Sequence, residues 1–210
     1  MRHAKSGWVT AGGLVLLAVV PVAAGLSRLH ELAAHVPVTA ANARFFAAPV
    51  PIVVHLVASL VFAVLGAFQF VPIIRISWPV WHRGAGRLLA VCGLAAALSG
   101  LWMSLTYPLP PSDGPALKLI RVAVGVAMAL SIILAVIAIR RRDVRAHAAW
   151  MTRAYALGMG AGTQVLTHLP WFILVGGMPD ADTRAWLMGA GWGINLVAAE
   201  IANVRRRRAS

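Results

Sequence analysis

Residues 117–139 read LKLIRVAVGVAMALSIILAVIAI and are followed by three arginines at positions 140–142. A helix that crosses a membrane needs about 20 predominantly apolar residues, so this stretch is long enough to span a bilayer. Its two basic residues, Lys118 and Arg121, lie near its beginning, and the three arginines stop it at the other membrane surface. The stretch therefore predicts a transmembrane helix.

Apolar stretches of similar length lie on both sides of it, separated by short connectors rich in arginine or proline. They predict spans at residues 8–29, 50–74, 84–107, 117–139, 149–175 and 186–204. The composition agrees, because 60% hydrophobic residues, 12% charged residues and a mean hydropathy of +0.79 do not describe a soluble domain. We therefore predict an all-α integral membrane protein, a six-transmembrane-helix bundle in which residues 1–210 form a single membrane domain.

The net charge of +13 would suggest a nucleic-acid partner in a soluble protein, but here Lys and Arg lie at helix ends. On alternate sides of the six predicted spans, 14 of the 19 lie on one side and five on the other. Because cytoplasmic loops carry the excess of Lys and Arg, both termini are predicted to be cytoplasmic (N-in/C-in), in a bacterial inner membrane. The expected partners are membrane lipids, including anionic headgroups on the cytoplasmic side, and not nucleic acid. The five on the outer side are Arg28, Arg44, Lys118, Arg121 and Arg184.

The first predicted span resembles a signal peptide but is too long for one. Its apolar run from Trp8 to Leu26 exceeds the roughly 7–15 residues of a signal-peptide core, so we predict that it is retained. Pro21 is expected to kink it. Cys92, the single cysteine, lies in an apolar run, which leaves no internal disulfide and no thiolate metal cluster.

Two pairs of glycines predict close packing of the last two spans. Gly158 and Gly162 are four residues apart in the fifth span, and Gly189 and Gly193 are four apart in the sixth. Small residues at this spacing let helix backbones approach each other closely in a membrane.

Polar residues within the spans are candidate functional positions, because each costs free energy in lipid unless it is paired or used. In the second span His55, Ser59 and Gln69 recur at steps that place them on one helical face. In the fifth span Gln164 and His168 are four residues apart. We expect these two polar faces to turn toward each other and to bring His55 and His168 together near the outer membrane surface.

A second pair of histidines lies near the predicted cytoplasmic surface. His82 opens the third span with Arg83 and Arg87, and His147 precedes the fifth span, in which Arg153 follows. Two interpretations are open: these side chains extend to the headgroups and bind lipid phosphate, or they hold a cofactor.

The sixth span contains Asn195 and Glu200. Glu200 is expected either to pair with a neighbouring arginine at the inner interface or to act in a proton relay.

Four groups of residues form an ordered set of motifs. They are His55 to Gln69-Phe70, His82-Arg83-x-x-Gly86-Arg87, Asp143 to His147-x-x-Trp150-Met151-x-Arg153-x-Tyr155-Ala156, and Trp192 with Asn195-Leu196-x-x-Ala199-Glu200. In this order they resemble the predicted bacterial membrane proteins grouped as domain of unknown function 2306 (DUF2306). The resemblance covers about residues 50–204 and leaves the first span outside. It implies a multi-pass membrane protein and supplies no function.

The two layers of histidines suggest redox chemistry. Neutral imidazoles on different helices ligate haem b, and two haems stacked across a bilayer carry electrons through it. In span number and histidine layering the chain is similar to six-helix b-type cytochromes and their ferric-reductase relatives. We therefore expect a membrane oxidoreductase that forms a homo-oligomer or meets a redox partner. The expected haem contacts are His55 and His168 as one axial pair, His82 and His147 as a second, and Arg83, Arg87 and Arg153 at propionates or lipid phosphates.

Two other classes of function are alternatives. A small-solute transporter or channel would use polar groups along its pathway, namely Gln69, Gln164, Asn195 and Arg121. A structural or accessory subunit without a cofactor would use its polar groups as interhelical hydrogen bonds. A hydrolase is not expected, because Glu200 is the only carboxylate within a predicted span and hydrolysis needs carboxylates beside the histidines.

Overall fold

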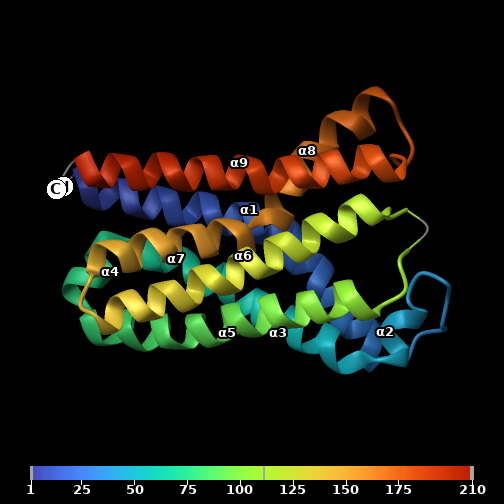
Figure 1. Cartoon of the computed structure of the whole chain (residues 1–210), viewed down its shortest axis with the longest axis horizontal. Coiled ribbons are helices and arrows are strands. Elements are labelled where there is room, and N and C mark those ends of the chain that lie inside the picture. Colours follow the sequence, from blue (N-terminus) through green and yellow to red (C-terminus); the bar gives the residue numbers. More distant parts are fainter. Residues whose placement is uncertain (1, 111, 209–210) are drawn as a thin grey trace.

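The computed structural model describes residues 2–110 and 112–208, with side chains from residue 7 onward, and Figure 1 shows them as a bundle of helices. The described residues are helical or lie in connecting loops and contain no strand. The elements are α1 (Arg2–Ala33), α2 (Ala43–Ala47), α3 (Pro49–Ala67), the 3-10 turn η1 (Phe68–Phe70), α4 (Pro72–Ser77), α5 (Pro79–Thr106), α6 (Pro115–Arg140), α7 (Val144–Gly158), α8 (Gly160–Leu174) and α9 (Ala181–Arg208).

Proline residues set where four of these helices begin. Pro49, Pro72, Pro79 and Pro115 occupy the first or second positions of α3, α4, α5 and α6. The first N–H groups of a helix have no partner within it, so a residue without an N–H is tolerated there. These helix boundaries follow directly from the sequence.

Two of the six predicted spans are interrupted. The span predicted at 50–74 is α3, then η1, then α4, because Pro72 holds Val71 in an extended conformation with φ −85° and ψ 109°. The span predicted at 149–175 is divided at Met159 into α7 and α8, each 15 residues long. Within the described residues, five segments are long and apolar enough to cross a membrane alone: α1 from Gly7, α3 with η1, α5, α6 and α9. The chain is therefore a multi-pass helical membrane protein.

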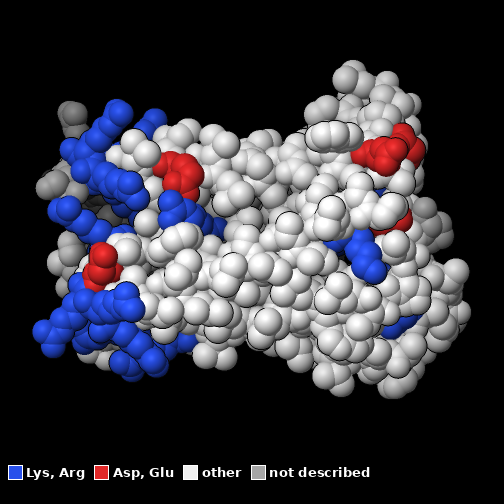
Figure 2. Space-filling model, in the orientation of Figure 1, with Lys and Arg blue, Asp and Glu red and all other residues white. Residues whose placement is uncertain are grey.

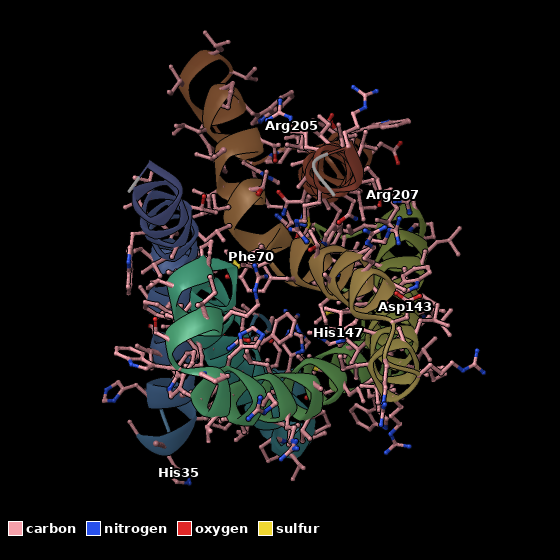
Figure 3. The ribbon with its side chains drawn as sticks, turned by 90° about the vertical axis from the view of Figure 1, so that its left-hand side faces the viewer. His35, Phe70, Asp143, His147, Arg205 and Arg207 are labelled. Atoms are coloured by element: carbon pink, nitrogen blue, oxygen red, sulfur yellow. The ribbon has the colours of Figure 1, made fainter. Side chains whose placement is uncertain are left out.

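The break at Met159 sends α7 and α8 along different paths. α7 packs against α3, α5, α6 and α9 and lies in the middle of the bundle, whereas α8 packs mainly against α1 and α9 and leaves the middle (Figure 1; Figure 3). Gly158 and Gly160 flank the break, and glycine is a poor helix former. A Cβ at Gly158 would press on Phe62 of α3, and one at Gly160 would overlap Trp192 of α9. The glycines therefore both weaken the helix and admit its neighbours.

Polar side chains hold α8 onto α9. Thr163 Oγ1 donates to Asn195 Oδ1 at 2.7 Å, and Thr167 Oγ1 donates to the Leu187 carbonyl at 2.8 Å. Asn195 Nδ2 also donates to the carbonyl of Ala156 on α7 at 3.0 Å, so one side chain connects three helices. Lipid tails offer no hydrogen-bond partner, so these bonds between helices favour the packing of α8 on α9. Thr167 Oγ1 also lies 3.1 Å from the Gln164 carbonyl of its own helix. We call this set of contacts the α8–α9 seam.

The two ends of the bundle differ in charge. α1 begins and α9 ends at the same end (Figure 1), and Figure 2 shows Lys and Arg gathered there. We call it the basic end; it carries Arg75 at the end of α4, Arg140 at the end of α6 and Arg205–Arg208 at the end of α9.

A closely packed part of the core surrounds Tyr155 of α7. Its ring packs against Phe62 and Phe70, with ring centroids 5.6 and 5.1 Å apart, and its hydroxyl donates to the Ala63 carbonyl at 2.6 Å. A Cβ at Gly66 would overlap the same ring. α3 and α7 approach this closely because residue 66 has no side chain.

Large apolar side chains are exposed along the outside of the bundle. Leu16 of α1 is 74% exposed, Val91 of α5 66%, Leu119 of α6 70% and Val197 of α9 61%. Such a surface is unfavourable in water and suits contact with lipid tails.

Three of the four glycines predicted to pack do so. A Cβ at Gly158, Gly162 or Gly189 would meet a neighbouring helix within 4 Å, whereas nothing lies within 4 Å of one at Gly193. The prediction is wrong for Gly193, which is exposed on the outer face of α9.

We predict that Gly162→Ala destabilises the protein. The added methyl group would overlap the backbone carbonyl oxygen of Leu17 on α1, which cannot turn aside as a flexible side chain can. Overpacking of this kind costs about 1–3 kcal/mol. Unfolding of the detergent-solubilised protein measures the loss. Gly193→Ala is the matched control and should keep or raise the stability, because alanine is the better helix former. Equal losses in the two variants would contradict the proposed contact.

Candidate functional site

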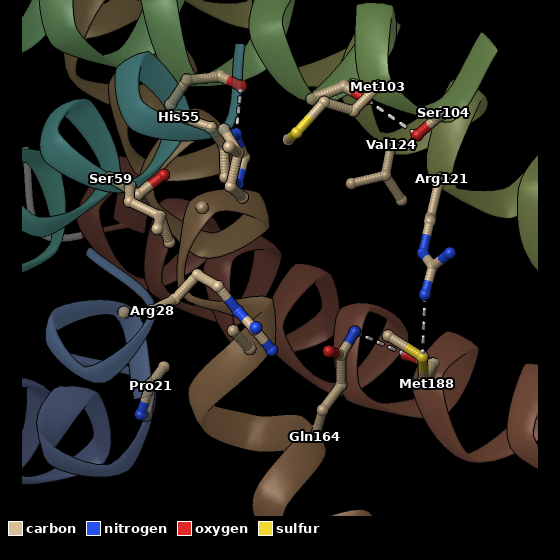
Figure 4. A pocket seen from close by; sticks show the side chains of 18 of the residues that line it. Pro21, Arg28, His55, Ser59, Met103, Ser104, Arg121, Val124, Gln164 and Met188 are labelled. Carbon is tan, nitrogen blue, oxygen red and sulfur yellow. Dashed lines mark hydrogen bonds between the residues drawn. The ribbon is translucent and has the colours of Figure 1, made fainter. Parts of the chain in front are cut away.

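A cavity of about 990 Å³ lies inside the bundle, toward the end opposite the basic end, in the space that α8 leaves free. Residues of α1, α2, α3, α5, α6, α7, α8 and α9 line it, together with loops at that end. Figure 4 shows Arg28, His55 and Arg121 pointing into it from three different helices. Phe62 and Met128, which are 2% and 6% exposed, belong to its lining and to the packed core, so they form its floor.

The lining has an apolar and a charged zone. Its deeper part is contributed by aliphatic and small residues of five helices, so a ligand there meets mostly hydrocarbon. The residues of this apolar zone include Val22, Ala63, Ala97, Val124, Gly125 and Leu157.

The charged zone lies at the opening and is strongly basic. All five Lys and Arg residues that the sequence places on this side of the membrane line the cavity, and Asp113 is the only carboxylate of the lining among the described residues. Positive charges therefore exceed negative charges by four at the cavity wall. In the sequence these five residues are topology signals, and Arg121 is also a candidate pathway group of a transporter; their convergence on one cavity is visible only in the structure. They are Arg28, Arg44, Lys118, Arg121 and Arg184.

Asp113 connects two of these cations. Its Oδ2 accepts a hydrogen bond from Arg121 Nη1 at 2.6 Å, and its Oδ1 accepts one from Arg184 Nε at 2.8 Å. Its side chain is 1% exposed. Burial alone would raise the pKa of Asp113, but Arg121 and Arg184 hold it below the ordinary value of an aspartate. The carboxylate thus joins α6 to α9 at the opening.

Arg28 and Arg44 meet on one aromatic ring. Their guanidinium carbons lie 4.8 and 4.5 Å from the centre of the Phe45 ring, a cation–π arrangement. Arg28 also pairs with Glu31 of its own helix. The stacking keeps both cations at the rim of the cavity.

Arg44 and Lys118 form no ion pair with any residue that the structure describes. Burial lowers the pKa of Arg44; Asp113 opposes this effect, and the nearby Arg28 and Arg121 add to it. Around Arg44, positive charge therefore exceeds the negative charge that Asp113 supplies. An anion at this point would relieve the repulsion.

His55 lies deeper in the cavity. Its Nδ1 donates to the carbonyl of Ala96 on α5 at 2.9 Å, and the Ser99 hydroxyl lies 3.3 Å from the same nitrogen. A proton on Nδ1 leaves Nε2 as the basic nitrogen of the neutral ring. No hydrogen-bond partner for that nitrogen is seen among the described residues, so Nε2 is the atom left to meet a ligand.

The structure does not bring His55 and His168 to one cavity. Ser59 and Gln164 line the cavity together with His55, and Gln164 Nε2 donates to the Met188 carbonyl at 3.3 Å. His168 is not part of that lining; its Nδ1 donates to the Gln164 carbonyl at 2.7 Å. Thr163 and Thr167 of α8 turn toward α9 in the α8–α9 seam, whereas His168 Nε2 is buried without a hydrogen-bond partner among the described residues.

The residues predicted near the cytoplasmic surface lie at the basic end and outside this cavity. His147 Nδ1 donates to the Ala135 carbonyl at 3.0 Å. Arg153 forms a two-bond ion pair with Glu200, with Nε to Oε1 at 2.5 Å and Nη2 to Oε2 at 2.9 Å. The predicted pairing of Glu200 with an arginine is confirmed, and Arg153 thereby joins α7 to α9. Arg83 and Arg87 are exposed on α5.

We predict that stability depends on pH through Asp113. Because folding lowers its pKa, the ion pairs contribute fully above about pH 4, the ordinary aspartate value, and are lost as the pH falls through the lower pKa of the folded state. Asp113→Asn should lower the free energy of unfolding by about 2 kcal/mol near neutral pH and flatten this acid loss. Thermal unfolding in detergent between pH 3 and 7 tests it, with Asp182→Asn as control. An unchanged pH profile in Asp113→Asn would contradict it.

Comparisons with known proteins place the chain in a family. The family model described as "Predicted membrane protein (DUF2306)" matches residues 52–203. The comparison with curated proteins finds no match, and the comparison with solved structures finds none. The matched segment covers more than half of the chain and contains the motifs that carry the resemblance. The protein therefore belongs to the family of predicted membrane proteins DUF2306.

Proposed function

We propose that this protein binds an amphiphilic anion in the cavity, a molecule with a phosphate or carboxylate head and an apolar body. The observation that carries the proposal is the convergence of five cations on the rim of a cavity whose deeper wall is hydrocarbon. An anionic head at the rim would meet Arg44 and Lys118, which have no carboxylate of their own in the described structure. The apolar body would lie against Val124 and Phe62.

The size of the cavity supports a ligand larger than a simple ion. Ligand sites typically enclose about 300–1,000 Å³, and this cavity of about 990 Å³ lies at the upper end of that range. A small inorganic anion would fill only its rim and leave the apolar zone uncovered. An amphiphile uses both zones.

The proposal includes an orientation. We infer six crossings, with α7 and α8 together forming one of them, both termini in the cytoplasm and the protein in a bacterial inner membrane. The concentration of Lys and Arg at the basic end supports this orientation, since such excess marks the cytoplasmic side. The cavity then opens on the side away from the cytoplasm. A carrier or a sensor of an extracytoplasmic amphiphile fits this arrangement.

A second candidate ligand is haem b, which is itself an amphiphilic anion. The specific observation in its favour is His55, whose Nδ1 is held by Ala96 and whose Nε2 is left for an axial bond. The propionates would lie among the five rim cations, and the iron would supply electron transfer. His168 does not fit the axial pair expected from the sequence, because it lies outside the cavity lining. Only His55 is retained as a ligand in this proposal.

We predict that dodecyl phosphate binds the detergent-solubilised protein and raises its unfolding temperature. Lys118→Gln should weaken binding about tenfold, since a charge-assisted hydrogen bond contributes about 1.5–3 kcal/mol. Arg140→Gln is the matched control, because it removes one charge from the opposite end of the same helix. Dodecanol and inorganic phosphate, which each carry half of the ligand, should bind more weakly than dodecyl phosphate. Equal effects of the two substitutions would show non-specific charge attraction and contradict the site.

For the haem candidate we predict a stoichiometric b-type absorption spectrum after expression with adequate haem supply. His55→Ala should abolish it, His168→Ala should leave it intact, and dodecyl phosphate should displace the haem. A colourless protein that still binds dodecyl phosphate would exclude haem and retain the amphiphile proposal.

A further inference from the structure

Two buried side-chain nitrogens at the basic end have no hydrogen-bond partner among the described residues. They are Nε2 of Gln69 in η1 and Nδ1 of His82 in the first turn of α5. A buried polar atom left unpaired costs about 1–3 kcal/mol. Neither residue lines the large cavity, so whatever satisfies these atoms is separate from the amphiphile site.

The two side chains lie close together. Gln69 Oε1 would be 3.8 Å from a Cβ at Gly86, and Gly86 is one helical turn after His82 on the same face of α5. Arg75, in the last turn of α4 between them in the chain, is within electrostatic range of His82, and so is His147 of α7. Figure 3 views this end and shows His147 beside the bundle axis, with Phe70 of η1 nearby. We call Gln69, Arg75, His82 and His147 the basic-end cluster.

The electrostatic neighbours of His82 are all basic: Arg75, His147 and Arg83. Asp143 and Glu200, the carboxylates described toward this end, have partners of their own and are not among these neighbours. Asp143 accepts from the Ala146 N–H at 2.8 Å as the cap of α7, and Glu200 is paired with Arg153. The described structure therefore supplies no anion to this cluster.

We propose that the basic-end cluster binds a phosphate-type anion, either the headgroup phosphate of a membrane lipid or a free phosphate ester. The amide N–H of Gln69 and an N–H of His82 would donate to phosphate oxygens, and the exposed guanidinium of Arg75 would neutralise the charge. His147 commits Nδ1 to Ala135, which leaves its other ring nitrogen for the same ligand. This is a built site, because the two unpaired atoms are interior and fixed by η1 and α5. A general attraction of lipid headgroups to surface arginines would not need the two unpaired atoms of Gln69 and His82.

Thermal unfolding of the delipidated protein tests the proposal, because a ligand of the folded state raises the unfolding temperature in proportion to its occupancy. The probes are dihexanoyl phosphatidylglycerol, dihexanoyl phosphatidylcholine and inorganic phosphate. We expect the phosphatidylglycerol to stabilise the wild type. Gln69→Met and Arg75→Gln should weaken its binding at least tenfold. Gln69→Met should leave the stability without ligand equal or higher, because it removes an unpaired polar atom and no protein hydrogen bond.

Arg140→Gln is the control, because Arg140 lies at the same end and outside the cluster. The affinity of this variant for phosphatidylglycerol should stay within twofold of that of the wild type. Stabilisation by inorganic phosphate that is lost in Gln69→Met would identify a free phosphate ester as the ligand, and stabilisation by phosphatidylglycerol alone would identify a lipid headgroup. The proposal is overturned if Gln69→Met binds like the wild type, if Arg140→Gln and Arg75→Gln weaken binding equally, or if phosphatidylcholine binds as well as phosphatidylglycerol. Dodecyl phosphate binding measured on Gln69→Met separates this result from the cavity, since that variant should bind it normally.

Discussion

The attachment of α8 to α9 is the interaction on which the shape of the interior depends. If α8 continued the axis of α7, it would occupy the middle of the bundle along its whole length. The chain instead breaks between two glycines, and Thr163 and Thr167 find their acceptors on α9. Water is absent from the lipid interior, so these bonds between the two helices favour the attachment of α8 to α9. The cavity is the space that this diversion leaves.

The cavity favours anionic ligands because basic side chains surround its opening. Cations from α1, α2, α6 and α9 converge there, and a single buried carboxylate, Asp113, pairs with two of them. Unpaired positive charge at this rim costs free energy in a membrane protein unless an anion binds there. The amphiphilic anion that we propose would do so. The basic-end cluster presents the same problem on a smaller scale, with unpaired donors and basic neighbours and no carboxylate of its own.

The motifs that mark the family mostly build the framework. Tyr155 joins α7 to α3, Arg153 and Glu200 join α7 to α9, and Asn195 connects α7, α8 and α9. Two of the five rim cations, Arg28 and Arg44, lie outside the segment that the family model matches. These framework contacts therefore lie within the matched segment, whereas the charge of the rim depends in part on α1 and α2.

The sequence by itself determined that the chain lies in a membrane, where most of its helices run, and which end of the bundle is basic. Each of these is local: the length of an apolar run, a proline at a helix start, a cluster of arginines. The sequence also located the polar residues within the spans and predicted that Glu200 pairs with an arginine. Only the tertiary structure decided where α8 goes, that His55 reaches the cavity without His168, and that cations counted as topology signals share one rim. The physical reason is that these depend on how helices rotate and pack against one another, and residues as far apart as Arg28 and Arg184 meet only after that packing is complete.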